Sequence, residues 1–131
     1  MVKIEKQELI KTPLSDDALK LAQSLYSTYI LNNKEPSMCV SLKKLYHLFG
    51  LSDADSSLEK IFEIFADLSE PVMVHDFVYR GKKYSTVVLT FCKYEKIVKD
   101  DMESCMRIEM NEMYLDVLKN YMLHPFLEIK Y

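Results

Sequence analysis

Glycine is nearly absent from this sequence, with Gly50 and Gly81 the only two in 131 residues. Glycine-rich loops allow a backbone to approach phosphate groups closely, and both the P-loop and the dinucleotide-binding fingerprint need more glycines than this. The sequence therefore excludes these two classes of nucleotide-binding site.

Cysteine is also scarce. Cys39, Cys92 and Cys105 are odd in number and lack the close paired spacing of a zinc site. The three histidines are far apart and show no ligand spacing either. We therefore expect no disulfide framework, no metal and no cofactor, and the composition favours a reducing, cytoplasmic location.

Long apolar runs are missing as well. No segment approaches the roughly 18 to 20 apolar residues needed to cross a bilayer, and the first residues lack the apolar core of a signal peptide. The hydrophobic content of 49% is that of an ordinary soluble protein, and the length suits one domain over 1–131. Within it, residues 1–14 fit either an arm or a short strand, and 124–131 form a tail.

Apolar residues recur at helical spacing in four segments, 16–32, 40–50, 57–70 and 112–123. Ser15, Ser41 and Asn111 stand where helix caps are expected, because their side chains can accept hydrogen bonds from unpaired backbone amides. Gly50 suits the left-handed backbone that often ends a helix. The sequence therefore predicts four helices.

Two segments rich in β-branched and aromatic residues, 71–79 and 82–91, meet at Arg80-Gly81 and predict a β-hairpin. Residues 38–40 predict a short strand that pairs with this hairpin, 93–103 a charged loop, and 105–110 a half-exposed strand. The order of these elements predicts an α+β fold, a winged helix-turn-helix with a small antiparallel sheet. The expected core includes Leu25, Tyr29, Leu45, Phe49, Ile61, Phe65, Val74, Val88 and Leu118.

Charge is unevenly distributed along the chain, although the formal net charge is only -3. Residues 71–99 contain six cations against two carboxylates, whereas the helix over 57–70 contains Lys60 against four carboxylates. Residues 100–131 are also acidic, with three cations against seven carboxylates. An acidic helix is repelled by phosphates, so sequence reading by the third helix in a DNA groove is disfavoured.

The cationic hairpin, taken as the wing of the winged helix, predicts a non-enzymatic DNA-binding module, associated with replication or transcription, that touches the phosphate backbone through this basic wing. The candidate contacts are Arg80, Lys82, Lys83, Lys43 and Lys44. A simpler interpretation stands beside this one, because lysines on an edge strand are often solvated and guard against aggregation. Tyr79 and Tyr84 fit either stacking on single-stranded bases or cross-strand packing.

The alternative function is a winged-helix protein-interaction or homodimerisation module. It would use the acidic third helix and the Met- and Tyr-rich C-terminal helix, where Tyr114 and Tyr121 share a face. No catalytic motif is present, so we expect no enzyme. Cys92, beside Lys93, fits a structural thiol better than a reactive one.

The segments VSLKKLYHLFGL, SSLEKIFEIFADL and MRIEMNEMYLDVLKN, together with the hairpin, resemble one winged-helix unit of the plasmid replication initiator family. The resemblance covers about residues 15–123 and consists of apolar positions and turns. It implies a winged helix with a role in replication. Initiators of this kind carry two such units with a basic DNA-reading helix. Since this chain has room for one unit and its helix is acidic, the resemblance implies the dimerising or backbone-touching unit.

Overall fold

The computed structural model describes residues 5–52, 55–98 and 104–129. Within these ranges the chain is an α+β protein with four helices, as the sequence predicts, and five strands, one more than predicted. The elements in chain order are α1 (Asp16–Leu31), β1 (Ser37–Ser41), α2 (Leu42–Leu48), α3 (Asp55–Leu68), β2 (Val72–Tyr79), β3 (Lys82–Leu89), β4 (Cys92–Val98), β5 (Ser104–Met110) and α4 (Glu112–Asn120).

Three of the helices begin at the predicted caps. The Ser15 hydroxyl accepts a hydrogen bond from the backbone N–H of Ala18 at 3.1 Å, and the Ser41 hydroxyl accepts one from Lys44 at 3.2 Å. Asn111 accepts from the first amides of α4 in the same way. Each cap satisfies a backbone donor that the helix itself leaves unpaired, so these starts are determined locally.

The strands form two separate antiparallel sheets, one of order β1-β5-β4 and one that contains only β2 and β3. The β2–β3 hairpin, called the ribbon below, confirms the prediction at Arg80-Gly81. The expected pairing of strand 38–40 with this hairpin is wrong, because β1 pairs with β5. That register places Met38 opposite Ile108 and Val40 opposite Met106, which directs the apolar side chains of both strands toward the core.

The charged segment over 93–103 is not a loop throughout. Residues 92–98 form β4, which pairs with β5, while 99–103 lie outside the described residues. The strand is hidden in the sequence because neither of its faces is consistently apolar. Lys96 shares a face with Tyr94, and Ile97 shares the other face with Glu95. Cys92 is buried and Tyr94 half-buried, whereas Lys93, Glu95 and Lys96 are exposed.

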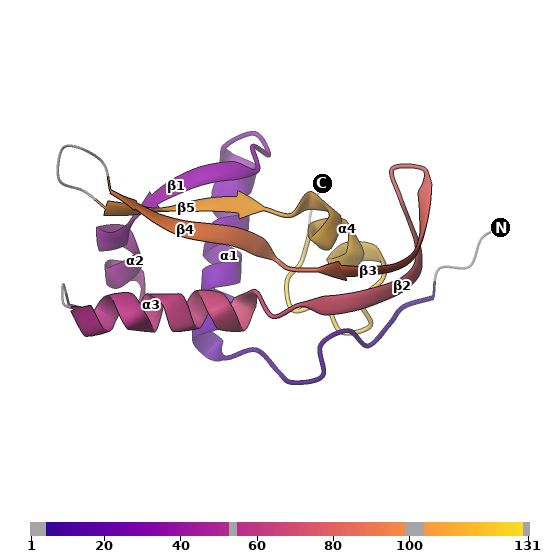
Figure 1. The fold of residues 1–131 in the computed structure, drawn as a ribbon, viewed down its shortest axis with the longest axis horizontal. Helices are drawn as coiled ribbons and strands as arrows, with labels where there is room; N and C mark the ends of the chain where they lie inside the picture. The colour runs from indigo at the N-terminus through magenta and orange to yellow at the C-terminus, as the bar shows by residue number, and fades with distance from the viewer. Residues whose placement is uncertain (1–4, 53–54, 99–103, 130–131) are drawn as a thin grey trace.

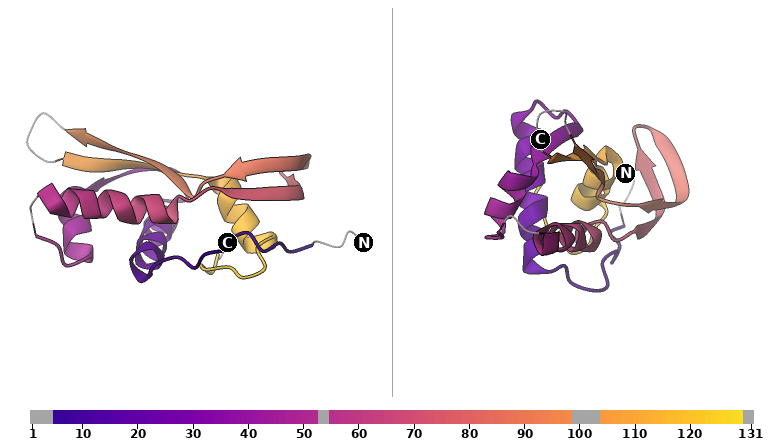
Figure 2. Two further views of the ribbon diagram at one scale, coloured as in Figure 1. Left: turned by 60° about the horizontal axis from the view of Figure 1, so that its bottom comes forward. Right: turned by 60° about the vertical axis from the view of Figure 1, so that its left-hand side comes forward.

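The two sheets lie along one side of the molecule and the helices along the other (Figure 2). Helices α1, α2 and α3 cover the three-stranded sheet, and α4 lies beneath the ribbon at the other end (Figure 1). Phe65 of α3 packs on Tyr94 of β4 with ring centroids 4.8 Å apart, and Phe91 meets Tyr114 of α4 edge-on at 5.5 Å. The core is therefore continuous beneath both sheets.

Most of the predicted core is buried. The confirmed residues are Leu25, Tyr29, Leu45, Ile61, Phe65, Val74 and Leu118. Phe49 is only half-buried, and Val88 is wrong because its side chain is 58% exposed. Leu89 points inward at the end of β3, so the alternation of a strand turns Val88 outward, where it faces Met73 across the ribbon.

The N-terminal segment lies against the C-terminal end of the chain. The backbone N–H of Gln7 donates to the carbonyl of Tyr121 at 2.6 Å, and that of Leu123 donates to the carbonyl of Gln7 at 2.8 Å. These bonds form an isolated parallel bridge with Met122 and not a strand of either sheet. Among the described residues, no helix combines the length and the apolar character that crossing a membrane requires.

Val74 and Val88 form a matched pair for testing the orientation of the ribbon. Val74 is fully buried, so Val74→Ala leaves a cavity and should lower the free energy of unfolding by roughly 2 kcal/mol. Val88→Ala removes the same atoms from an exposed site and should change it by about 0.5 kcal/mol or less. Urea denaturation of both variants measures the difference, and equal losses would show that the ribbon faces are assigned wrongly.

Candidate functional site

The candidate interface is the turn of the ribbon. Arg80 and Gly81 occupy it with positive φ angles of 49° and 75°, so both adopt the left-handed backbone of a tight two-residue hairpin. Gly81 adopts this conformation without steric cost, which explains why one of the two glycines stands here. Lys82 and Lys83 follow immediately, and both are exposed. We call Arg80, Lys82 and Lys83 the basic tip.

Arg80 is held against the body of the protein. Its Nη2 atom lies 3.8 Å from Oε1 of Glu112, and its guanidinium carbon lies 5.0 Å from the centre of the Tyr79 ring. Glu112 is itself oriented by the hydroxyl of Tyr29, which donates to Oε2 at 2.9 Å. The Arg80 side chain remains 70% exposed, so this contact orients the side chain without removing it from water.

Lys43 and Lys44 do not join the basic tip. They are exposed on α2, which lies at the opposite end of the longest axis from the turn of the ribbon (Figures 1 and 2). The five predicted contact residues therefore form two separate cationic sites. Lys43 and Lys44 cannot extend the local field around Arg80, Lys82 and Lys83.

The two tyrosines beside the turn take part in packing. Tyr84 stacks on Phe77 with centroids 5.2 Å apart and an angle of 18° between the rings. Lys82 lies over the Tyr84 ring at 5.3 Å, and Tyr79 is half-buried beneath Arg80. Of the two interpretations left open by the sequence, these contacts favour cross-strand packing.

The outward face of α3 is acidic. Glu59 and Glu63 are exposed next to Lys60, and Glu70 is exposed just beyond the end of the helix. Asp67 is half-buried, and its carboxylate accepts a hydrogen bond from the backbone N–H of Ser15, the N-cap residue of α1. This distribution agrees with the expectation that α3 is a poor groove-reading helix, because its exposed carboxylates have the same negative charge as phosphates and are repelled by them.

The C-terminal helix does not present the predicted partner surface. Tyr114, Tyr121 and Met122 are buried in the core, and Met113 is half-buried. Burial raises the pKa of Tyr114, so its hydroxyl stays neutral. The shared face of the two tyrosines is used to pack the ribbon and the aromatic cluster around Phe91 and is not available to a partner.

Two residues that support the site have no sequence signal. The hydroxyl of Tyr121 accepts from the backbone N–H of Val78 at 3.1 Å and donates to its carbonyl at 3.3 Å, across 43 positions in sequence. On the same edge of the ribbon, the side-chain amide of Gln7 pairs with both backbone groups of His75. Nothing in the local sequence marks Tyr121 or Gln7, because each partner is distant along the chain.

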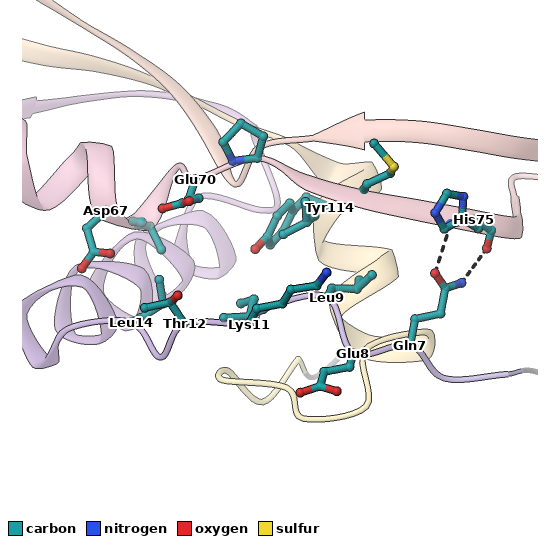
Figure 3. A pocket seen from close by; sticks show the side chains of 15 residues that line it. Gln7, Glu8, Leu9, Lys11, Thr12, Leu14, Asp67, Glu70, His75 and Tyr114 are labelled. Carbon is teal, nitrogen blue, oxygen red and sulfur yellow. Dashed lines mark hydrogen bonds between the residues drawn. The ribbon is translucent and has the colours of Figure 1, made fainter.

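A pocket of about 530 Å³ lies between the N-terminal segment, the end of α3 and β2 (Figure 3). Its volume falls within the range of small-molecule sites, about 300 to 1,000 Å³. The Tyr114 hydroxyl points into it, and Asp67 and Glu70 contribute carboxylates at one side (Figure 3). None of the basic tip residues lines this pocket, so it is separate from the cationic surface.

Cys92 behaves as a structural thiol. It is buried, its sulfur lies 3.7 Å from the Ser69 hydroxyl, and burial raises its pKa to about 11. The neighbouring Lys93 is exposed and does not activate it. In the part of the chain that the structure describes, no group of His, Cys, Asp and Glu side chains is arranged to hold a metal ion.

Comparison with known proteins gives no further indication of function. No protein-family model matches the chain, and no curated protein or solved structure matches it significantly.

The raised pKa of Cys92 predicts a loss of stability at alkaline pH. An exposed thiol ionises near pH 9.0, whereas the buried one stays protonated to about 11. The folded state gains from this below pH 9 and loses it as the pH rises to 11, by roughly 2 kcal/mol in all. Urea denaturation from pH 8 to 11 measures the loss. In Cys92→Ala, the fall in this window should be smaller by that amount, and an unchanged pH profile would contradict the assignment.

Proposed function

We propose that this chain is a non-enzymatic, winged-helix-like DNA-binding module that contacts the phosphate backbone through the basic tip. The observation that carries the proposal is the position of Arg80, Lys82 and Lys83. They stand at the turn of a two-stranded ribbon that extends away from the acidic α3. The basic tip can approach phosphates while the acidic α3 stays distant, although Glu112 of α4 lies beside the tip, 3.8 Å from Arg80.

The topology supports a winged-helix interpretation. Helix α1, strand β1 and helices α2 and α3 follow one another, and a later hairpin, β4–β5, pairs through β5 with β1. In this interpretation the wing is β4–β5 and not the cationic hairpin over 71–91 that the sequence predicts, because β5 and not the ribbon pairs with β1. The ribbon is then an insertion between α3 and β4. The proposed relationship to replication initiators rests on the same order of elements, with α3 as part of a backbone-touching unit and not as a reading helix.

The number of available cations limits the proposed affinity. Lys82 and Lys83 are exposed, whereas the positive charge of Arg80 is partly offset by the carboxylate of Glu112 beside it. Each phosphate contact contributes about 0.9 to the slope of log affinity against log salt on duplex DNA, so two or three contacts predict a weak, salt-sensitive interaction. Contacts of this kind position a protein on DNA but read no base sequence.

The test is charge reversal at the tip with a matched control at the other end. Lys82→Glu/Lys83→Glu should lower affinity for a short duplex at least tenfold and reduce the salt slope by about 2. Lys43→Glu/Lys44→Glu changes the net charge equally and should lower affinity much less. Fluorescence anisotropy over a salt series measures both.

Equal losses in the two variants would show that net charge and not the basic tip drives binding. If the wild-type protein fails to bind duplex or single-stranded DNA even at low salt, the proposal is wrong. A preference for single-stranded DNA would change the ligand class and leave the tip as the site.

A second function, self-association through the ribbon, is favoured by apolar side chains on its outer face. Met73 and Val88 face each other across the strands and are 55% and 58% exposed, and Val78 is 42% exposed. Cross-strand apolar pairs of this kind in water can mark a protein contact. This surface replaces α4 in the protein-interaction alternative, because the tyrosines of α4 are buried.

Sedimentation of the protein over a range of concentrations tests this second function. If the outer face mediates a dimer, Met73→Glu should raise the dissociation constant at least tenfold, because burying a carboxylate in an apolar contact is costly. Val98→Glu, on exposed β4, is the matched control and should leave the dimer intact. A monomer at every concentration would exclude the dimer.

A further inference from the structure

Two of the three cysteines lie close together on the adjacent, paired strands β1 and β5. Cys39 lies in β1 and Cys105 in β5, 66 positions apart in sequence, and their sulfur atoms are 2.6 Å apart. In the register of these strands Cys39 faces Arg107 and Cys105 faces Ser41, so the two thiols are diagonal neighbours on one face of the sheet. Both are thiols in this structure.

We propose that Cys39 and Cys105 form a reversible disulfide that fastens the edge strand β1 to β5. A disulfide bond is about 2.05 Å long, so the sulfur atoms need to move by only about half an ångström to reach it. The site is a redox modification site and does not depend on the DNA-binding proposal, because neither cysteine belongs to the basic tip.

The reaction is a thiol-disulfide exchange with a small-molecule disulfide as oxidant. Cys39 is exposed, so its thiolate attacks one sulfur of the oxidant, forms a mixed disulfide and releases one thiolate. The thiolate of the buried Cys105 then attacks Sγ of Cys39 and releases the second. Two protein thiols are oxidised, one small disulfide is reduced to two thiols, and the two protons lost by the cysteines pass to the released thiolates.

The third cysteine does not compete for this bond. Cys92 is buried, and its sulfur contacts the hydroxyl of Ser69. Its pKa of about 11 leaves very little thiolate at neutral pH, and thiolate is the form that reacts. Oxidation is therefore directed to one pair, with Cys92 as an internal reference.

The position of the pair explains what the bond would do. Strand β1 is five residues long, lies at the edge of its sheet and connects α1 to α2. A disulfide between Cys39 and Cys105 would keep β1 paired with β5. In the unfolded chain it would close a loop between two residues that are 66 positions apart. Loop closure of this length stabilises the folded state, so the oxidised protein should melt at a temperature roughly 10 °C higher.

The experiment is incubation of the reduced, folded protein with oxidised glutathione. We expect the mass to fall by two hydrogen atoms, one thiol to remain on denaturation, and peptide mapping to join the segments that contain Cys39 and Cys105. The melting temperature should rise, and dithiothreitol should reverse every change.

Two variants separate this outcome from others. Cys39→Ser changes an exposed side chain, so it should fold and melt like the reduced protein, and oxidised glutathione should not raise its melting temperature. Cys92→Ala should still form the bond, and if that variant fails to fold, the peptide map of the natural sequence gives the answer. A stable mixed disulfide on Cys39, a bond that includes Cys92, or three unreacted thiols would overturn the proposal.

Discussion

The position of the ribbon depends on Tyr121. A two-stranded hairpin is at best marginally stable alone in water, so β2–β3 needs support from another element. Tyr121 provides it twice, with its hydroxyl bonded to both backbone groups of Val78 and its ring edge-on to Phe77 at 5.7 Å. Gln7 closes the same edge at His75. The turn and its cations are held in place by contacts on the opposite, buried side of the hairpin.

Arg80 links the exposed turn of the ribbon to the helices beneath it. Through Glu112 it links the turn of the ribbon to the start of α4, and through Glu112 and Tyr29 it reaches α1. An ion pair this exposed contributes little to stability, since water and salt screen it. Its effect is to orient the arginine, which leaves Lys82 and Lys83 as the more available phosphate ligands and explains why only modest affinity is proposed.

Charges of both signs occur at both ends of the molecule, and the basic tip differs in its position at the turn of the ribbon. The end that contains α2, α3 and the three-stranded sheet presents Glu59 and Glu63 of α3, the separate cationic site Lys43 and Lys44 of α2, and the pair Arg107 and Glu95, whose side chains are 3.2 Å apart. The ribbon presents the basic tip at the other end (Figure 1). A local contact with phosphates is possible despite the net negative charge, because Lys82 and Lys83 are exposed at the turn of the ribbon, away from the carboxylates of α3.

Local signals in the sequence determine the helices and the hairpin turn. Capping by Ser15, Ser41 and Asn111 and the left-handed Gly81 act over a few residues, so they can be read without knowledge of the rest of the chain. The acidity of α3 and the cationic character of the turn follow from composition in the same way.

Tertiary structure alone decides the contacts between distant segments. Strand β4 escaped prediction because Lys93, Glu95 and Lys96 interrupt its apolar pattern on both faces, and β1 pairs with β5 because that register buries Met38 and Ile108. The separation of α2, which contains Lys43, from the ribbon, which contains Lys83, follows from the same packing (Figure 1). Such pairings depend on which faces of two strands are buried together. The sequence of one strand does not show which strand it will pair with or which face of that strand is buried.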